Sequence, residues 1–596
     1  MKFKNFFSAF SPNLKLRLIF LFLFLLFLTI LEFFSLSTIP LIVKTFLSNS
    51  SDLILFDINF QKLFIIFPGK DNITRLIFGT IIIFTIKFFL YLFFFRYEVN
   101  FVRDVKSYFS ENIFNSYLSR DYLFFLNSNS SIVTRDVINE SENASQFVLC
   151  CLNLCKEFLL VLVIALVLIM YDPITSMVCI MFLAFFSYLF YLFTHKILHE
   201  IAVKRIAGLG ALYKIINETF SLIKEIKVSK KENFFYSKFK KSRNYFDQKI
   251  SERDFIVRLP KAVSEYLSVI SLTFLMLYFI YVEKEKDSLF VILSLVVVSI
   301  VRLVPSFNQI SGSLAHFKSY KESFLILLNE TLKFNLSKNS IDNKIKYIEK
   351  PNNTEIVFQS VYYDYSLDEK ITEKNLTMSL QVIKDVSFVI KKGEFIGVIG
   401  KSGSGKSTII NLMLGLLHPK RGSIEINNTP DKIGYVPQDI YLIDDTLKAN
   451  IALGHEEDEI DLLKINEIIK DCELESFVKN KKKDLNLMLG DKGVKISGGE
   501  KQRVSLARTL YNNKNIIIFD EATSSLDNET ERSVIESITN IKKKNDSDVT
   551  LIMIAHRLSS LKNCDRVILV ENGRIKDFDK LENIIKKYPE YENFSI

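Results

Sequence analysis

The chain contains no tryptophan and only six cysteines among its 596 residues. The cysteines have no paired spacing of the kind that holds a metal ion, so the sequence does not favour a metal site built on thiolates. Three of them, Cys150, Cys151 and Cys155, lie in one apolar run. We expect ordinary buried thiols there rather than redox or metal-binding groups.

The N-terminal segment has no acidic residue before Glu32, although it carries Lys2, Lys4, Lys15 and Arg17. Basic residues tend to remain on the cytoplasmic side of a membrane span, so the N-terminus is expected to lie inside the cell. The apolar run that follows is too long for a cleavable signal peptide and lacks a small-residue cleavage site, so no such peptide is expected.

Apolar residues, by contrast, are abundant. They make up 49% of the chain, with 54 phenylalanines, and they cluster in the first half. The net charge of +9 is compatible with nucleic-acid binding. The basic residues nevertheless gather in stretches that are expected to face the cytoplasm. Membrane topology therefore accounts for the charge, and no nucleic-acid partner is expected.

Six apolar runs are each long enough to cross a bilayer. They lie at about 18–47, 76–95, 147–170, 174–193, 262–282 and 288–306. Two of the polar stretches between them are too long for simple connectors, so helices are expected to continue out of the bilayer. Both termini then face the cytoplasm, with the spans in a bacterial inner membrane. The outer segment Ser48–Asn72 is expected to be either a short amphipathic helix or a plain loop.

Charged residues inside the spans are the candidates for contact with a substrate. A charge at the bilayer centre costs at least about 2.5–3.5 kcal/mol, so it usually faces a cavity or a partner. The candidates are Glu32, Lys87, Glu265 and Arg302, with Lys261 at a span end. Two interpretations stay open. These side chains line a cavity for substrate, or they form ion pairs between helices, for example Glu32 with Lys87.

The second half of the chain has a different pattern. Asn- and Lys-rich sequence at 336–355 indicates a linker, which follows a helical membrane domain at 1–335. Over 356–596, short apolar runs alternate with helical patterns, as is typical of an α/β domain. The predicted fold class is therefore an α-helical membrane domain of six spans followed by an α/β domain.

A glycine-rich stretch in this domain has the pattern of a phosphate-binding loop. It follows an apolar run, Phe395–Ile399, that indicates a buried strand, and it precedes a helical pattern over 409–417. The loop consists of Gly400, Lys401, Ser402, Gly403, Ser404, Gly405, Lys406, Ser407 and Thr408. Glycines let backbone N–H groups surround phosphate oxygens, and the helix N-terminus adds a favourable dipole. Lys406 would reach the outer phosphates and Ser407 would hold Mg²⁺, so ATP and Mg²⁺ are the expected ligands.

Further motifs lie on both sides of this loop. Tyr365 precedes it and is placed to stack on a base, although a core tyrosine is the alternative. The others are Gly434–Gln438, Ile496–Glu500, Ile516–Glu521, Ser525–Asp527 and His556. In this order they resemble the ATPase domain of ABC transporters. The matching pieces are the adenine-stacking aromatic, Walker A, the Q-loop, the signature, Walker B with its following glutamate, the D-loop and the switch histidine.

The resemblance implies a role for each matching residue. Asp520 and Gln438 would hold Mg²⁺ together with Ser407 of the phosphate loop. Glu521 would act as the general base toward the attacking water. His556 would hydrogen-bond the γ-phosphate.

The signature has a consequence for assembly. In this family Ser497, Gly498 and Gly499 would contact the γ-phosphate from the opposite subunit. Because the chain carries one ATPase domain, a homodimer with two equivalent sites is expected.

Two features depart from the family: Glu500 replaces the usual Gln, and the segment between Gly422 and the Q-loop is short and lacks a customary arginine.

The membrane half carries a finer resemblance, to lipid-linked oligosaccharide flippases of the PglK type. The similar stretches are Glu32–Pro40, Pro260–Glu265 and Val301–Ser306. In that family basic residues line an outward-facing cavity, and Lys87, Lys261 and Arg302 fall where the pattern has basic residues. Cations pair with phosphate oxygens whatever the sugar, so the resemblance implies a polyprenyl-pyrophosphate glycan as substrate.

The order of membrane domain and ATPase resembles ABC exporters, in which short coupling helices contact the ATPase domains. Arg120–Asn129 and Ile226–Asn233 are the candidate coupling segments. ATP binding would close the dimer and turn the cavity from inward to outward access. Two rival functions stay open: export of another amphiphile, such as a lipid A precursor, a drug or a peptide, and an ATP-gated channel or regulatory subunit that does not pump.

Overall fold

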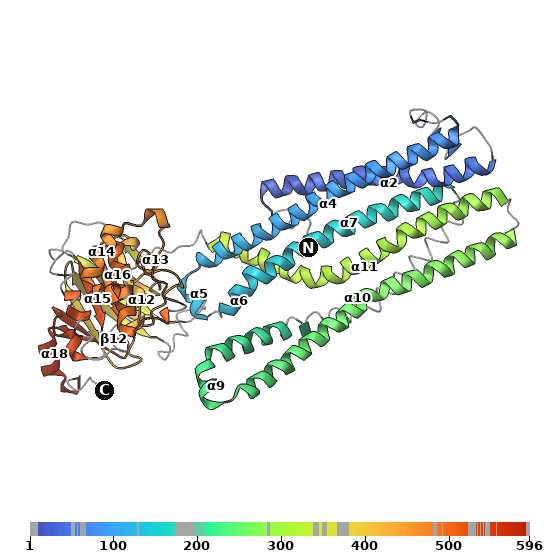
Figure 1. The fold of residues 1–596 in the computed structure, drawn as a ribbon. Coiled ribbons are helices and arrows are strands. Elements are labelled where there is room, and N and C mark those ends of the chain that lie inside the picture. The colour runs from blue at the N-terminus through green and yellow to red at the C-terminus, as the bar shows by residue number, and fades with distance from the viewer. Residues whose placement is uncertain are drawn as a thin grey trace. The chain divides into compact units, whose positions relative to one another are not determined.

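The structure is a computed structural model in which two compact units are described separately (Figure 1). One unit is Met1–Arg120 with Ser128–Asn339, and the other is Asp121–Asn127 with Ser340–Ile596. The described residues are 10–48, 54–55, 58–59, 67–68, 70–127, 130–171, 173, 197, 200–201, 204–205, 207–282, 286–337, 345–347, 354–365, 381–480, 485–490, 493–521, 532, 534–536, 538–539, 542, 549–555 and 557–591.

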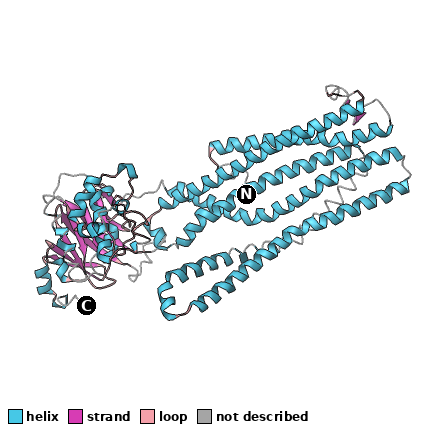
Figure 2. Ribbon diagram, viewed as in Figure 1, coloured by secondary structure: helices cyan, strands magenta, loops and turns pink. Residues whose placement is uncertain are grey.

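The first unit consists mainly of long helices that lie side by side (Figures 1 and 2). They are α2 (Pro12–Ser48), α4 (Asn72–Leu118), α6 (Ser130–Arg135), α7 (Ser141–Tyr171), α9 (Ile223–Ser229), α10 (Glu232–Val282) and α11 (Lys286–Ser337). α2 packs on α4, and α11 packs on α7, α10 and α2. In a helix the backbone N–H and C=O groups hydrogen-bond to one another. A membrane-spanning segment outside a closed β-barrel requires this, because hydrocarbon offers these groups no other partner.

Three helices among the described residues are long and apolar enough to cross a membrane: Pro12–Phe46, Asn72–Leu118 and Ile132–Met170. They contain the first three predicted spans. α10 and α11 contain the ranges predicted for spans five and six, whereas 174–193 lies outside the described residues. The count of six spans therefore stays a prediction.

Part of the segment 48–72, for which a short amphipathic helix or a plain loop was expected, forms two short strands. Strands β1 (Ile54–Leu55) and β2 (Ile58–Asn59) pair antiparallel, with Ile54 opposite Asn59 and Leu55 opposite Ile58. An amphipathic helix through these residues is therefore wrong. β-Branched isoleucines on both strands favour extended backbone over helix.

The three cysteines of the apolar run lie on α7, where their exposure differs. Cys150 is buried, Cys151 is half-buried and Cys155 is exposed. The expectation of buried thiols is therefore correct for Cys150 and wrong for Cys155. The three positions span more than one helical turn, so they fall on different faces of α7.

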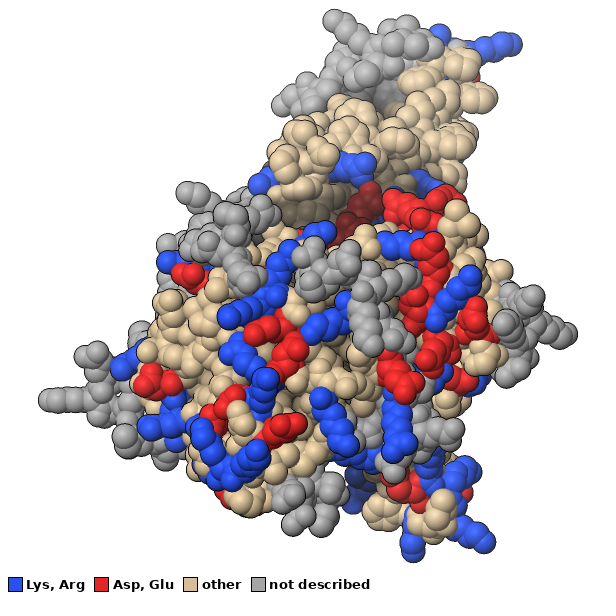
Figure 3. All heavy atoms as spheres, turned by 90° about the vertical axis from the view of Figure 1, so that its left-hand side faces the viewer, with Lys and Arg blue, Asp and Glu red and all other residues tan. Residues whose placement is uncertain are grey.

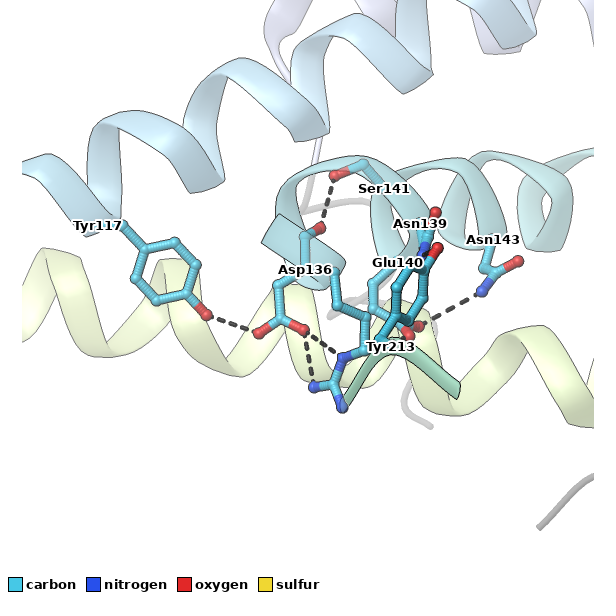
Figure 4. A network of polar contacts seen from close by, with 8 residues as sticks. Tyr117, Asp136, Asn139, Glu140, Ser141, Asn143 and Tyr213 are labelled. Atoms are coloured by element: carbon cyan, nitrogen blue, oxygen red, sulfur yellow. Dashed lines mark hydrogen bonds and ion pairs between the residues drawn. The ribbon is translucent and has the colours of Figure 1, made fainter. Parts of the chain in front are cut away.

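A π-helical turn, η1 (Asp136–Glu140), joins α6 to α7 and carries a polar network (Figure 4). The Tyr117 hydroxyl donates to Asp136 Oδ2 at 2.6 Å, and Arg135 donates through Nε and Nη2 to Oδ1 at 2.9 and 2.8 Å. The Ser141 hydroxyl donates to the Asp136 carbonyl at 3.2 Å. Hydrogen bonds and an ion pair thus satisfy a carboxylate that is almost fully buried, as a buried charge requires.

The second unit contains two sheets. The six-stranded sheet has the order β12-β11-β6-β10-β9-β8 and is parallel except where β12 pairs with β11. Its strands are β6 (Phe395–Ile399), β8 (Ile433–Val436), β9 (Ile516–Asp520), β10 (Thr550–Ile554), β11 (Arg566–Glu571) and β12 (Arg574–Asp579). The four-stranded sheet, in the order β3-β7-β4-β5, consists of β3 (Ile345–Tyr347), β4 (Thr354–Tyr363), β5 (Ile383–Lys391) and β7 (Arg421–Ile426).

Helices surround these strands (Figure 2). They are α5 (Tyr122–Asn127), α12 (Lys406–Met413), α13 (Leu447–Ile451), α14 (Leu462–Asp471), α15 (Glu475–Asn480), α16 (Gly498–Tyr511) and α18 (Leu581–Lys587), with short turns η2 (Pro430–Lys432), η3 (Glu457–Glu459), η5 (Leu558–Leu561) and η6 (Pro589–Tyr591). β6 and β10 are fully buried, as is typical of parallel strands that are covered on both faces. Tyr122 and Leu123 of α5 pack against the apolar core of this unit.

The surface of the second unit carries charges of both signs. Figure 3 shows Lys and Arg side chains interspersed with Asp and Glu over one of its faces. No continuous basic surface lies among the described residues on the face that Figure 3 shows.

A buried asparagine joins the segment after Gln438 to α16. Asn450, on α13, accepts hydrogen bonds from the Ile443 amide at 3.0 Å and from Arg508 Nη2 at 3.1 Å. Its own amide donates to the carbonyls of Ile443 and Thr446. Arg508 also donates to the carbonyls of Asn450 and Tyr441.

We expect Asn450→Ala to lower the free energy of unfolding of the second unit by about 1–3 kcal/mol, because the Ile443 amide and carbonyl and Arg508 Nη2 lose the hydrogen bonds that the Asn450 side chain supplies. Thermal unfolding of the purified chain measures this loss. Asn466→Ala, at an exposed position on α14, is the matched control and should leave the transition unchanged. Equal midpoints for the two variants would contradict the role given to Asn450.

Candidate functional site

The phosphate loop lies between the end of β6 and the start of α12. Gly405 caps the helix with φ 108°, and Gly400 has φ 153°. A Cβ at Gly400 would lie 2.2 Å from the Val570 carbonyl oxygen and 2.7 Å from Ser404 Oγ. A Cβ at Gly403 would meet no atom within 4 Å. The glycine at 400 is therefore required by packing as well as by its backbone conformation.

Two observations show that this loop fits a phosphate group. The Ser404 hydroxyl is buried and has no hydrogen-bond partner among the described residues. Lys406 Nζ turns back into the loop and donates to the carbonyls of Gly400 at 2.8 Å and Lys401 at 3.1 Å. An anion in the loop would give both groups a better partner than backbone carbonyls. Ser407, the second residue of α12, is exposed.

The two acidic residues of Walker B lie at the carboxyl end of β9. The Tyr435 hydroxyl donates to Asp520 Oδ2 at 3.0 Å, and the Gln438 amide donates to Glu521 Oε2 at 2.8 Å. Glu521 has φ 50°, a left-handed conformation that is uncommon for residues other than glycine. Each carboxylate is thus held by a side chain from the segment Tyr435–Gln438. Tyr435 lay inside a recognised motif, but sequence reasoning gave it no role.

Charge interactions link the phosphate loop to Walker B. Burial lowers the pKa of the Lys406 ammonium, and the carboxylates of Glu521 and Asp520 act in the opposite direction. Burial raises the pKa of the Asp520 carboxyl, whereas the hydrogen bond from Tyr435 favours its charged form. The structure therefore brings the predicted phosphate lysine, Mg²⁺ carboxylate and general base together, within electrostatic range of one another.

The side chain of Tyr365 contacts α12, the helix that follows the phosphate loop. Its hydroxyl lies 3.0 Å from Thr408 Oγ1, and its ring meets that of Tyr363 edge-on with the centroids 5.1 Å apart. The side chain is 39% exposed. It is therefore neither a fully buried core tyrosine nor distant from the loop, and a role in stacking on adenine stays a prediction.

The signature residues form the start of α16. Ser497 caps this helix, with its hydroxyl accepting from the Glu500 amide at 3.3 Å. Glu500 Oε2 accepts from the Ser497 amide at 2.7 Å and from the Ser497 hydroxyl at 2.9 Å. The replacement of Gln by Glu at position 500 thus preserves a capping box. Gly498 has open space at its Cβ position, and Gly499 is buried.

Some predicted site residues fall outside the description. His556 and Ser525–Asp527 lie outside the described residues, and nothing is described of the Lys261 side chain. Their predicted roles stay predictions. Glu265 is described on α10 and is exposed.

Three of the charged residues predicted for substrate contact, Glu32, Lys87 and Arg302, meet in the helical unit. Lys87, on α4, forms an ion pair with Glu32 Oε2 on α2 and donates to Ser35 Oγ at 3.0 Å. Arg302 Nε, on α11, lies 3.3 Å from Glu32 Oε1. The Tyr91 hydroxyl is 3.5 Å from Glu32 Oε2. One fully buried carboxylate therefore contacts two cations from two other helices.

The two cations differ in the exposed fraction of their side chains. The side chain of Lys87 is 4% exposed, whereas that of Arg302 is 37% exposed. The ion pair between Glu32 and Lys87 agrees with the helix-to-helix interpretation for these two residues. Among these three residues, Arg302 alone keeps side-chain surface available to a further partner.

The two candidate coupling segments form short helices. The first contains α5, which clusters with the second unit although it follows directly from α4. The second overlaps the C-terminal part of α9, whose C-cap is Lys230 with φ 53°, and the start of α10 at Glu232. Val228, on α9, is 86% exposed. Whether either segment couples transport to ATP hydrolysis stays a prediction.

We expect Gly400→Ala to abolish binding of a fluorescent ATP analogue, because the added methyl would overlap the Val570 carbonyl oxygen and displace the loop. Gly403→Ala is the matched control. It adds the same methyl at φ 76° but meets no neighbour, so only a backbone strain of about 1 kcal/mol or slightly more is expected. Fluorescence titration of the purified chain measures both variants. Equal affinities would show that packing around Gly400 does not shape the loop.

The comparisons with known proteins agree with this geometry. Residues 383–524 match the family described as ABC transporter. A putative export ATP-binding/permease protein of Rickettsia typhi is 32% identical over 263 residues, which cover 42% of this chain and 43% of the relative. ATP-dependent lipid A-core flippases of Saccharophagus degradans and Bordetella avium are 35% and 37% identical over 221 and 206 residues. These two matches cover 35% and 32% of this chain and 37% and 34% of the relatives.

The chain thus matches less than half the length of these curated relatives. The likeness to a solved structure is longer. A bacterial Atm1-family ABC exporter with ATP bound aligns over 98% of both chains with a TM-score of 0.73 and 19% sequence identity. At that identity the likeness shows the fold. The second unit therefore contains an ABC transporter ATPase domain, and the chain as a whole has the fold of an ABC exporter.

Proposed function

We propose that this chain is an ATP-driven exporter of a lipid with a phosphorylated head group, and that it works by alternating access in the bacterial inner membrane. Three findings support the proposal: the ABC transporter match, the exporter fold, and a phosphate loop whose lysine lies within electrostatic range of both Walker B carboxylates. In this proposal the ATPase unit and both termini face the cytoplasm.

The residues of the second unit supply what phosphoryl transfer requires, which is positioning and charge neutralisation. Lys406 binds the outer phosphates, and the hydroxyl of Ser407 and the carboxylate of Asp520 would hold Mg²⁺. The ion adds positive charge beside the phosphates. Glu521 accepts a proton from the attacking water. Gln438, which is bonded to Glu521 in the structure, keeps that carboxylate at the site.

The dimer follows from the location of the signature. Ser497 and the N-terminus of α16 offer hydroxyl and N–H donors, which are suited to a phosphate. In the proposed assembly a second copy of the chain supplies these donors to the ATP that is bound by the first. Two equivalent sites then form between two copies.

The observation that carries the substrate assignment is the charge imbalance around Glu32. Lys87 and Arg302 both contact this single carboxylate, so the three residues together carry one excess positive charge. Arg302 also keeps part of its side chain exposed. A guanidinium binds phosphate oxygens through parallel hydrogen bonds. Within this class we propose a polyprenyl-pyrophosphate glycan, with Lys261 as a further contact.

A second candidate is a lipid A-like substrate. Relatives named ATP-dependent lipid A-core flippase match about a third of this chain at 34–37% identity. The excess positive charge around Glu32 would also suit a phosphorylated lipid of this kind. The matches do not distinguish the two lipids, so a transport measurement is needed.

We expect the purified chain, reconstituted in proteoliposomes, to move a polyprenyl-pyrophosphate glycan in an ATP-dependent manner. Glu521→Gln should reduce both transport and ATP hydrolysis at least about 100-fold, because the general base is lost. Arg302→Ala should reduce transport while ATP hydrolysis in detergent continues. The measurement is protection of the glycan from a modifying enzyme on one side of the vesicle.

Arg243→Ala is the control for charge removal, because Arg243 is exposed on α10, where it pairs with Asp247 and lies over the ring of Phe246 on the same helix. It should transport as the wild type does. ATP hydrolysis without movement of the glycan, but with movement of lipid A, would replace the first substrate by the second. Equal transport by wild type and Arg302→Ala would contradict the role of the Glu32 cluster.

A further inference from the structure

The tyrosine that precedes the Q-loop contacts the Mg²⁺ carboxylate directly. Tyr435 lies on β8, which is an edge strand, and its hydroxyl donates to Asp520 Oδ2 at 3.0 Å. β8 and β9 are parallel, and Tyr435 pairs with Ile518, two residues before Asp520. Residues two apart on a strand point to the same face, so the long tyrosine side chain reaches forward to the carboxylate.

This bond has the form expected of a support for a metal ligand. A carboxylate oxygen has two lone pairs, so accepting from Tyr435 leaves capacity for a metal-bound water. The bond also restricts rotation of the Asp520 side chain. Carboxylates that hold metals are commonly fixed by such hydrogen bonds, and loss of the supporting group typically costs about 10–100-fold in metal affinity.

Tyr435 also lies near α5, which belongs to the same unit. The Tyr122 phenol, on α5, lies within electrostatic range of the Tyr435 phenol. Tyr122 packs against the apolar cluster that includes Ile518, the residue opposite Tyr435. α5 follows directly from α4 in the chain, with only Ser119–Asp121 between them. Tyr435 is therefore close both to the proposed Mg²⁺ ligand and to a segment that continues from a predicted membrane span.

We propose that Tyr435 is a positioning residue of the Mg²⁺ site and that it makes the affinity for Mg²⁺ sensitive to α5. The inference rests on the proposed function, since it assigns Asp520 to Mg²⁺. It adds a path from α5 to the metal ligand that is separate from the bond between Gln438 and Glu521.

The first test uses the full-length chain in detergent, with Mn²⁺ as the probe and a non-hydrolysable ATP analogue present. Electron paramagnetic resonance of free Mn²⁺ gives the affinity without reference to activity. Tyr435→Phe should raise the dissociation constant for Mn²⁺ by about 10-fold or more, while binding of a fluorescent nucleotide in chelator stays unchanged. The unchanged nucleotide binding also shows that the variant is folded.

Tyr441→Phe is the matched control, because that ring is 60% exposed and makes no side-chain hydrogen bond in the described structure. Its Mn²⁺ affinity should equal that of the wild type. A Tyr435→Phe variant whose Mn²⁺ affinity stays within twofold of the wild type would overturn the proposal. Absence of ATP hydrolysis by the wild type would instead count against the proposed function.

The second test addresses α5. Tyr122→Leu should weaken Mn²⁺ binding severalfold in the wild-type chain but not in a chain that already carries Tyr435→Phe, because the effect passes through the Tyr435 hydroxyl. Phe125→Leu, at a position on α5 that is 40% exposed, should have no effect in either chain. Equal effects of Tyr122→Leu in both chains would show that α5 does not act through Tyr435.

Discussion

The parallel arrangement of β6, β10, β9 and β8 is the constraint on which the nucleotide site depends. Parallel strands end at the same edge of a sheet, and ligands of open α/β sheets bind at that edge. The phosphate loop follows β6, the Walker B carboxylates end β9, and the Q-loop follows β8. Groups that are more than a hundred residues apart in the chain therefore meet without any long loop to carry them.

The burial of these strands makes the arrangement rigid. β6 and β10 have no exposed residue, and β9 is exposed only toward its end at Asp520. A shift of one strand would move buried apolar side chains out of a close-packed interior, which is costly. The polar end of β9 can thus carry two adjacent carboxylates, because the rest of the strand holds them in register.

The helical unit is constrained by one charge rather than by a sheet. Glu32 is fully buried, and breaking a buried ion pair by removal of one partner typically costs about 3–5 kcal/mol. α4 and α11 each supply a cation to this carboxylate, so the charge requires three helices to keep one relative position. Any state of this unit that separates them needs another anion for the cations, and a phosphorylated lipid would provide one.

Local patterns predicted the ATPase motifs, whereas most contacts between residues distant in sequence were not predicted. The ion pair of Glu32 with Lys87 was one of two interpretations that the sequence left open. The phosphate loop, Walker B and signature are contiguous motifs, and the structure brings the residues of the first two together as the strand–loop–helix pattern implies. The bond from Tyr435 to Asp520 depends on which strands are neighbours, which one sequence does not reveal. The pairing of β1 with β2 was not predicted, because the sequence left open only an amphipathic helix and a plain loop for that segment. The exposure of Cys155 depends on which face of α7 meets other helices.

The place of α5 affects how the protein can be divided. The chain leaves the helical unit at Arg120, contributes seven residues to the second unit, and returns at Ser128. Tyr122 and Leu123 fill part of the apolar surface of that unit. A fragment cut at residue 340 would lack both side chains and would expose the apolar patch that they cover, which favours aggregation. The ATPase unit is therefore discontinuous in sequence, and its solubility in isolation depends on a peptide that belongs to the other half of the gene.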